Sequence, residues 1–219
     1  MIWIKICGTT NLEDALTAVD AGADALGFVF YEKSPRKIDP ETAREVVEQL
    51  PPDIEKFGVF VNDPVETILN TVVQAGLTAV QLHGVDCRSP EVIRRLKGSR
   101  ELKIFVALQA GEAGRFDAIE SNGAGINAIL LDSGTSQLPG GTGKTFDWSG
   151  SAAGVERIAK NMNVVVAGGL TPDNVTEAIR ILKPWGVDVV SGVEARPGKK
   201  DPERVRAFVK AVRSAEKKN

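Results

Sequence analysis

The stretch KFGVFVNDPVETILNTVVQAGLTAVQL, residues 56–82, contains one complete unit of the repeating pattern that decides the fold. The apolar run Lys56–Val61 lacks strict polar alternation, which is typical of a parallel strand covered on both faces. Asp63-Pro64 pairs a capping side chain with proline at the first helical position, and the amphipathic segment Val65–Ala75 predicts the helix that follows. A second apolar run, Ala79–Leu82, predicts the next strand.

The same unit recurs along the chain. The expected strands are Ile2–Ile6, Ala25–Phe30, Lys56–Val61, Ala79–Leu82, Leu102–Leu108, Ala128–Leu131, Val164–Ala167 and Val187–Val190. The expected helices are Asn11–Ala21, Glu41–Leu50, Val65–Ala75, Pro90–Lys97, Gly114–Asn122, Trp148–Lys160, Pro172–Leu182 and Pro202–Ala215. Capping residues before proline mark five helix starts, at Asp39-Pro40, Asp63-Pro64, Ser89-Pro90, Thr171-Pro172 and Asp201-Pro202.

Eight strand–helix units in 219 residues average about 27 residues each, which is compact but sufficient. Strands that alternate with helices throughout predict a parallel sheet, and eight of them favour a closed (βα)8 barrel of the TIM type. An open, doubly wound sheet is the rival α/β fold. No linker or low-complexity segment divides the chain, so residues 1–219 are expected to form a single domain.

Composition excludes several classes of protein. A net charge of −2 lacks the basic excess of a general nucleic-acid binder, so nucleic acid is not an expected partner. No apolar run approaches the ~18 residues of a membrane-spanning helix, and no signal peptide is present, so we expect a cytoplasmic location without membrane contact. The two cysteines, Cys7 and Cys87, belong to no Cys/His cluster, which argues against a disulfide scaffold and a structural metal site.

Reactive side chains of a (βα)8 barrel gather at the carboxyl ends of the strands and in the loops after them. This rule reduces the polar residues of the chain to a short list. The residues at the strand ends are Cys7, Gln81, His83, Asp132, Asp188 and Ser191, and the second loop adds Ser34-Pro35-Arg36.

Cys7 and Asp132 are the candidates for proton transfer. Cys7 closes the first strand on the same face as Lys5, where a thiolate favoured by a neighbouring ammonium would serve as a nucleophile or base. Core packing is the alternative for Cys7, and its position in the sequence taken alone favours that alternative. Asp132 follows four apolar residues, so partial burial would raise its pKa into the range of a general acid or base, while the alternative is a cap on the next loop. His83 is either a site residue or a structural ring.

Small residues follow the last two strands, in Gly168-Gly169-Leu170 and Ser191-Gly192. Barrel enzymes commonly bind phosphate in these two loops through backbone N–H groups. The segment Gly140–Thr145 resembles a nucleotide-binding loop but fails both the Walker and the GxGxxG spacing, because Leu138 and Phe146 stand where glycine is required. It predicts a loop over the mouth, from which Lys144 could reach an anion.

Taken together, the motifs resemble those of the phosphoribosylanthranilate isomerases. The matching segments run in order along nearly the whole chain: Lys5-Ile6-Cys7-Gly8, Gly27-Phe28-Val29-Phe30, Ser34-Pro35-Arg36, Gly58-Val59-Phe60-Val61-Asn62, Gln81-Leu82-His83-Gly84, Leu130-Leu131-Asp132, Gly140–Trp148, Gly168-Gly169-Leu170 and Ser191-Gly192-Val193-Glu194. The combination is specific, although no single segment is.

The resemblance implies an activity and roles for named residues. The family carries out an Amadori rearrangement in tryptophan biosynthesis, on a phosphorylated aminosugar and without cofactor or metal. The resemblance gives Cys7 the role of general base and Asp132 that of general acid. It makes Arg36 the partner of the anthranilate carboxylate, and gives Asp188 one of two roles, to orient the ribose hydroxyls or to support the mouth of the barrel. Substrate contacts are also expected of Gln81 and His83, and phosphate contacts of Gly168, Gly169, Ser191 and Gly192.

Two other functions remain open. The related histidine-pathway isomerase performs the same rearrangement on a larger substrate, alone or in a bifunctional enzyme, but resembles this chain less because it uses aspartate where Cys7 stands. The second alternative is a barrel that binds a phosphorylated ligand without catalysis. The sequence is compatible with a monomer or a homodimer.

Overall fold

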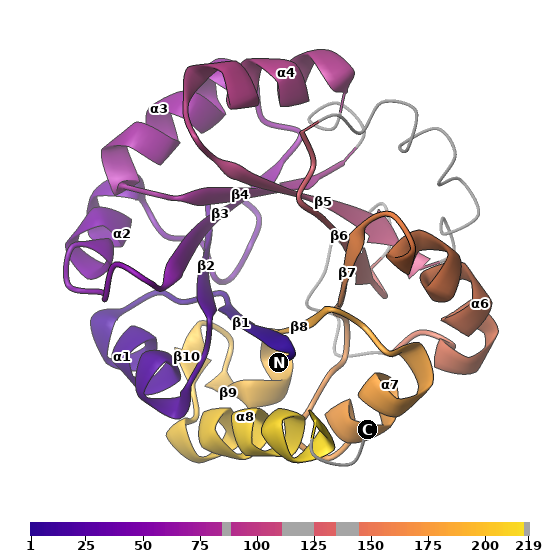
Figure 1. Cartoon of the computed structure of the whole chain (residues 1–219). Coiled ribbons are helices and arrows are strands. Elements are labelled where there is room, and N and C mark those ends of the chain that lie inside the picture. Colours follow the sequence, from indigo (N-terminus) through magenta and orange to yellow (C-terminus); the bar gives the residue numbers. More distant parts are fainter. Residues whose placement is uncertain (85–88, 111–124, 135–144, 217–219) are drawn as a thin grey trace.

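Eight parallel strands close into a barrel in the computed structural model, which describes residues 1–84, 89–110, 125–134 and 145–216 (Figure 1). Each strand pairs with the next along the chain, and β1 pairs with β8, so the sheet has no edge. The (βα)8 barrel is thereby confirmed and the open sheet is wrong. The strands are β1 (Trp3–Cys7), β2 (Ala25–Val29), β3 (Glu55–Val61), β4 (Ala79–His83), β5 (Lys103–Gln109), β6 (Ala128–Asp132), β7 (Asn163–Val166) and β8 (Gly186–Val189).

Helices surround the barrel (Figure 1). They are α1 (Leu12–Ala21), α2 (Pro40–Val47), α3 (Val65–Ala75), α4 (Pro90–Ser99), α6 (Trp148–Ala159), α7 (Val175–Leu182) and α8 (Pro202–Glu216). The helix expected near residues 114–122 lies outside the described residues. Among the helices that the structure describes, none has the length and apolar character that crossing a bilayer requires.

A short hairpin between β8 and α8 was not predicted. After β8 the chain forms a 3-10 turn, η3 (Ser191–Val193), and then the antiparallel strands β9 (Glu194–Arg196) and β10 (Lys199–Lys200). Strands of three and two residues are too short to produce a periodic signal. The backbone N–H of Lys200 donates to the Asp14 carboxylate, which ties the hairpin to α1.

Three of the five predicted caps are confirmed. Side-chain oxygens accept backbone N–H bonds at the starts of α2, α4 and α8, from the residues Asp39, Ser89 and Asp201. These bonds satisfy N–H groups that the first helical turn leaves without partners.

The other two caps are wrong. Asp63 turns back to accept from the Val61 N–H, and α3 begins without a side-chain cap. The helix expected from Pro172 begins at Val175, because Asn174 accepts from the Thr171 N–H and donates to Gly169 O, which holds residues 169–174 in a turn. Proline therefore predicted a change of direction at this place, but not the first helical residue.

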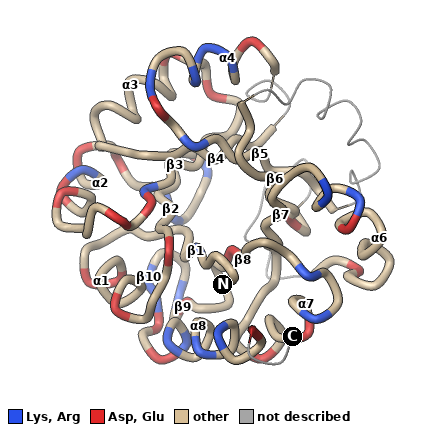
Figure 2. The backbone as a smooth tube through the Cα atoms, in the orientation of Figure 1, with Lys and Arg blue, Asp and Glu red and all other residues tan. Residues whose placement is uncertain are grey.

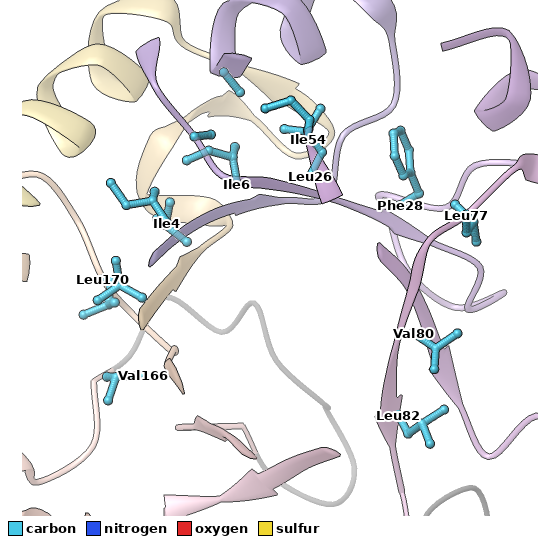
Figure 3. Close-up of a cluster of buried hydrophobic side chains, with 14 of the residues drawn as sticks. Ile4, Ile6, Leu26, Phe28, Ile54, Leu77, Val80, Leu82, Val166 and Leu170 are labelled. Atoms are coloured by element: carbon cyan, nitrogen blue, oxygen red, sulfur yellow. The ribbon is translucent and has the colours of Figure 1, made fainter. Parts of the chain in front are cut away.

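Period-two alternation divides each strand between two cores. Outward side chains such as Ile4, Leu26 and Leu82 are buried between the strands and the helices (Figure 3). Inward side chains fill the barrel, and at its amino-terminal end the rings of Trp3 and Phe57 pack with a centroid distance of 5.7 Å. Charged residues lie mostly on the helices around the outside (Figure 2). A charged group inside the barrel is therefore an exception, and its burial is costly unless it is paired and hydrogen-bonded.

Substitution at a helix cap that forms and at one that does not should have different effects on stability. Asp201→Ala is expected to lower the free energy of unfolding by about 1 kcal/mol, because two N–H groups of α8 lose their acceptor. Thr171→Ala is the matched control at a cap that does not form, and we expect a change within about 0.5 kcal/mol. Urea unfolding followed by circular dichroism measures both. Equal losses for the two variants would contradict the assignment.

Candidate active site

The mouth of the barrel holds a cavity that opens to solvent at the carboxyl ends of the strands. It collects six of the side chains predicted from the sequence, namely Cys7, Arg36, Gln81, His83, Asp132 and Asp188. These residues come from β1, the loop after β2, β4, β6 and the end of the barrel at β8, which closure places around one axis (Figure 1). The structure thus brings these six side chains together around one cavity.

Cys7 is the last residue of β1 and points into the barrel, where it is 4% exposed and packs with Val29 and Val59. Burial raises the pKa of its thiol, because a thiolate loses hydration there. The positive charges of Lys5 and Lys200 act in the opposite direction and favour the thiolate. Cys7 is thus both a core residue and a cavity residue, so the two sequence interpretations were not exclusive.

Asp132 ends β6 and reaches the same cavity. Its Oδ1 accepts from the Gly134 N–H at 2.8 Å, so the carboxyl group does cap the following loop, as the structural alternative proposed. Burial nevertheless raises its pKa, and the negative charge of Asp188 adds to that effect. The raised pKa favours the protonated carboxyl group, which is the form that a general acid needs.

A charged network lies beneath these two groups, inside the barrel. Lys5 is completely buried, and its Nζ donates to Asp188 Oδ1 at 2.8 Å and to Gln81 Oε1 at 2.9 Å. Burial alone would lower the pKa of Lys5, but the negative charges of Asp188 and of a Cys7 thiolate outweigh it and raise the pKa. Lys5 therefore stays charged in the middle of the barrel.

The same network orients His83. An ammonium group only donates, so the Gln81 oxygen must face Lys5 and the Gln81 amide nitrogen must face the histidine. That nitrogen lies 2.7 Å from His83 Nε2, which therefore accepts and leaves the ring proton on Nδ1. His83 is a hydrogen-bonded ring, as the structural reading had it, and it also lines the cavity.

Arg36 has a partner that the sequence did not reveal. Its Nε and Nη2 donate to the two carboxylate oxygens of Glu194 at 2.9 and 2.8 Å, a bidentate pair that is almost fully buried. Glu194 begins β9 and also accepts from Lys200. Its pKa is lowered, because the bonds and charges of Arg36 and Lys200 outweigh the effect of burial. Glu194 stood in a matching motif, but nothing in the sequence linked it to Arg36 across 158 residues.

Lys200 is a second buried ammonium that sequence reasoning missed. Its Nζ donates to the backbone oxygen of Cys7 at 2.5 Å and to that of Val190 at 3.3 Å, so it joins the ends of β1 and β8. Burial lowers its pKa despite the nearby Glu194. A lysine beside another lysine in a short strand has no pattern that would have predicted burial.

A smaller cavity adjoins the first and shares Asp132, Asp188 and Val190 with it. Its walls include Gly168, Gly169 and Ser191, three of the four residues predicted for phosphate. The fourth, Gly192, allows the two loops to touch, because a Cβ there would lie 1.9 Å from Leu170 O. The predicted loops thus line one small polar space beside the catalytic candidates.

Gly27 is a further site residue that the sequence did not single out. It pairs with Cys7 across β1 and β2, and a Cβ at Gly27 would lie 2.5 Å from Cys7 Sγ. The thiol of Cys7 therefore occupies space that is open only because Gly27 has no side chain. The signal was the interruption of an otherwise apolar strand by glycine, which often marks a close approach.

Some predictions fall outside the described residues. These concern Cys87, Lys144 and the loop around Gly140–Thr145. In the part of the chain that the structure describes, no three His, Cys, Asp or Glu side chains are grouped to hold a metal ion.

The fold and the site define a class: a TIM-barrel enzyme of small-molecule chemistry, with a buried thiol and a partly buried carboxyl group beside a glycine-lined pocket. The particular family follows from comparison with known proteins. Residues 4–211 match the model of the N-(5'-phosphoribosyl)anthranilate isomerase family, so the chain belongs to that family.

Individual relatives agree. The chain is 48% identical over 213 residues to the N-(5'-phosphoribosyl)anthranilate isomerase of Pelobacter propionicus, covering 97% of this chain and 96% of that protein. The crystal structure of the Thermotoga maritima isomerase is similar, with 42% identity, a TM-score of 0.85 and coverage of 98% and 100%. A further structure of phosphoribosylanthranilate isomerase, 41% identical with a TM-score of 0.82 and the same coverage, contains reduced 1-(o-carboxyphenylamino)-1-deoxyribulose 5-phosphate.

The place of Gly27 generates a prediction. Gly27→Ala is expected to reduce isomerase activity about a hundredfold, because the new methyl group must displace the Cys7 thiol. The matched control is Gly98→Ala, since a Cβ there would meet nothing within 4 Å. Steady-state kinetics with circular dichroism of both variants provides the measurement. Wild-type turnover by a folded Gly27→Ala protein would refute the role given to this glycine.

The raised pKa of Asp132 generates a prediction about stability and pH. A carboxyl group whose pKa is higher in the folded than in the unfolded state destabilises the fold as pH rises through the folded pKa. Asp132→Asn removes that cost and keeps an oxygen for the Gly134 N–H, so the variant is expected to melt about 2–4 °C higher at pH 7. The difference should shrink toward pH ~4, near the unfolded pKa. A lower melting temperature at pH 7 would contradict the burial argument.

Proposed function

We propose that this chain, an isomerase of tryptophan biosynthesis, converts N-(5-phosphoribosyl)anthranilate to 1-(2-carboxyphenylamino)-1-deoxyribulose 5-phosphate with Cys7 as general base and Asp132 as general acid. The observation that carries the proposal is that both groups line one cavity, next to the glycine-lined pocket. An aminosugar phosphate needs this arrangement, because its reacting carbons and its phosphate lie at different places on one small molecule.

The chemistry requires two proton transfers that involve the protein, followed by a tautomerisation. Asp132 gives its proton to the furanose ring oxygen while the bond from that oxygen to C1 breaks, which leaves a protonated Schiff base between C1 and the anthranilate nitrogen. Cys7 then removes the proton from C2, and the electrons of that C–H bond neutralise the iminium as an enolamine. Tautomerisation of the enolamine, in which the C2 hydroxyl loses its proton and C1 gains one, yields the ketone at C2. The raised pKa of Asp132 supports its part, because an acid must hold a proton before it can give one.

Each of the other side chains is assigned to one part of the substrate. Arg36 is the proposed partner of the anthranilate carboxylate, and the Glu194 pair holds its guanidinium by Nε and Nη2 so that Nη1 is left for the ligand. Gln81, His83 and Asp188 line the cavity where the ribose would lie. The phosphate is assigned to Gly168, Gly169, Ser191 and Gly192, whose backbone can approach its oxygens closely.

Oligomeric state, domain structure and location complete the proposal. The proposed roles all fall on residues of a single chain, and the protein is proposed to be a monomer or a homodimer. One domain comprising residues 1–219 accounts for the whole site. A cytoplasmic location suits an enzyme of amino-acid biosynthesis.

The fluorescence of phosphoribosylanthranilate provides the test. We expect the wild-type protein to consume it, and expect Cys7→Ala and Asp132→Asn each to reduce kcat by about 10²–10⁴-fold, the usual contribution of a general base or acid. Asp39→Asn, which makes the same chemical change at an exposed helix cap, is expected to retain full activity.

The outcomes separate the alternatives. If the wild-type protein leaves the fluorescence unchanged, the isomerase proposal fails and a binding function of the same cavity takes its place. If it also consumes the larger histidine-pathway substrate, the enzyme is bifunctional. Near-normal turnover by Cys7→Ala would show that Cys7 is not the general base, although the protein would still catalyse the overall reaction.

A further inference from the structure

The proposed function poses a problem of proton placement, and the inference below rests on it. The active form has a thiolate at Cys7 and a protonated Asp132. The inactive form, with a thiol at Cys7 and a carboxylate at Asp132, holds the same number of protons. Because pH acts on the number of bound protons, it cannot select between these two forms. Only the local electrostatics of the site can do so.

Burial by itself selects the wrong form. It raises the pKa of both groups, and a thiol begins from a much higher value than a carboxyl group, so the proton would stay on sulfur. Something in the site must therefore favour negative charge at Cys7 more than at Asp132.

The Lys5–Asp188 ion pair is placed to favour negative charge at Cys7 more than at Asp132. Lys5 and Asp188 are register partners across β1 and β8, the pairing that closes the barrel. Lys5 is 0% and Asp188 is 3% exposed, and their charged atoms are 2.8 Å apart. Lys5 precedes Cys7 by two residues on the same face of β1. Asp188 lines both cavities, each of which also contains Asp132.

We propose that the Lys5–Asp188 ion pair is an oriented dipole that distributes one proton between the two catalytic groups, with its positive end holding Cys7 as thiolate and its negative end holding Asp132 as acid. Lys5 is the positioning residue of this device. It acts through Cys7 and need not touch the substrate.

The two ends of the pair act unequally on the two groups. At Cys7 the charge of Lys5 has a larger effect than that of Asp188, and a hydrogen bond from Lys5 lowers the pKa of the thiol further. At Asp132 the order is reversed, since Asp188 raises the pKa of the carboxyl group by more than Lys5 lowers it. The same pair thus lowers the pKa of Cys7 and raises that of Asp132, and both effects favour the form with a thiolate at Cys7 and a proton on Asp132.

Other charged groups around Cys7 do not replace Lys5. Among the described residues, the ionisable or charged side chains that share the cavity of Cys7 or act on its charge are Lys5 of β1, Tyr31 and Arg36 of the loop after β2, His83 of β4, Asp132 of β6, Asp188 of β8 and Lys200 of β10. Lys200 also favours the thiolate, but its Nζ is engaged by two backbone oxygens and Glu194. Arg36 is neutralised by its bidentate pair with Glu194.

A purely structural role for Lys5 makes a different prediction. A buried ion pair contributes little net stability compared with apolar residues of similar volume, because both ions lose their hydration. If packing were its only role, replacing Lys5 would change the melting temperature without changing the protonation of Cys7.

The test measures the thiolate directly and requires no substrate. In a Cys87→Ser background, which leaves Cys7 as the only thiol, the rate of alkylation by iodoacetamide is followed against pH. We expect Lys5→Met to raise the midpoint for Cys7 by about one pH unit or more, and to slow alkylation at pH 7 about tenfold. Lys5→Arg keeps the charge and should recover most of the rate. Lys56→Met, which removes another buried lysine far from the site and bonded to Pro51 O, should leave the rate unchanged.

The opposite end of the pair provides a second arm that does not depend on Lys5→Met folding. Asp188→Asn is expected to accelerate alkylation of Cys7, since the positive end is no longer balanced, and at the same time to lower kcat/KM, since Asp132 loses the charge that keeps it protonated. A structural defect would not make the thiol more reactive while turnover falls.

The results decide between the readings. An unchanged alkylation midpoint in folded Lys5→Met, or slower alkylation in Asp188→Asn, would overturn the proposal. Because alkylation is measured without substrate, the dipole can stand even if the fluorescence assay rejects the isomerase reaction, and it can fail even if the reaction is observed.

Discussion

The register that closes the barrel is the constraint on which the site depends. It sets Lys5 opposite Asp188, and with them Trp3 opposite Gly186 and Ile4 opposite Val187. Side chains alternate along a strand, so a slip of one residue would move Lys5 from the interior to the helix-covered face. The same register puts Cys7 two residues above Lys5 at the mouth. Closure of the sheet and assembly of the charged network are therefore one event.

A charge inside a barrel must be fully paired, and here the pairing also transmits orientation. Lys5 fixes the direction of the Gln81 amide, and the amide fixes the tautomer of His83. A similar chain runs from Lys200 through Glu194 to Arg36. Rigid hydrogen-bonded support of this kind keeps the side chains at the mouth in place before a ligand arrives, which reduces the entropy lost on binding.

Much of the fold could be predicted because it is encoded locally. The run Lys56–Val61 and the helix Val65–Ala75 were recognised within one or two residues of their observed bounds. The start of α7 was not, because the Asn174 side chain holds a turn that periodicity does not report. The β9–β10 hairpin is held by contacts to α1 nearly 190 residues away, so no local pattern could have revealed it.

The sequence by itself determined the eightfold alternation, the strand-end positions of Cys7 and Asp132, and the two glycine loops, because strand period, capping and the barrel rule act over a few residues. Only the tertiary structure decided what surrounds those groups. Glu194 beside Arg36, Lys200 beneath the end of β1, and Asp188 against Lys5 are contacts between residues far apart in the chain. Their protonation and orientation follow from burial and from charges brought near by closure of the barrel, and neither exists in the unfolded chain.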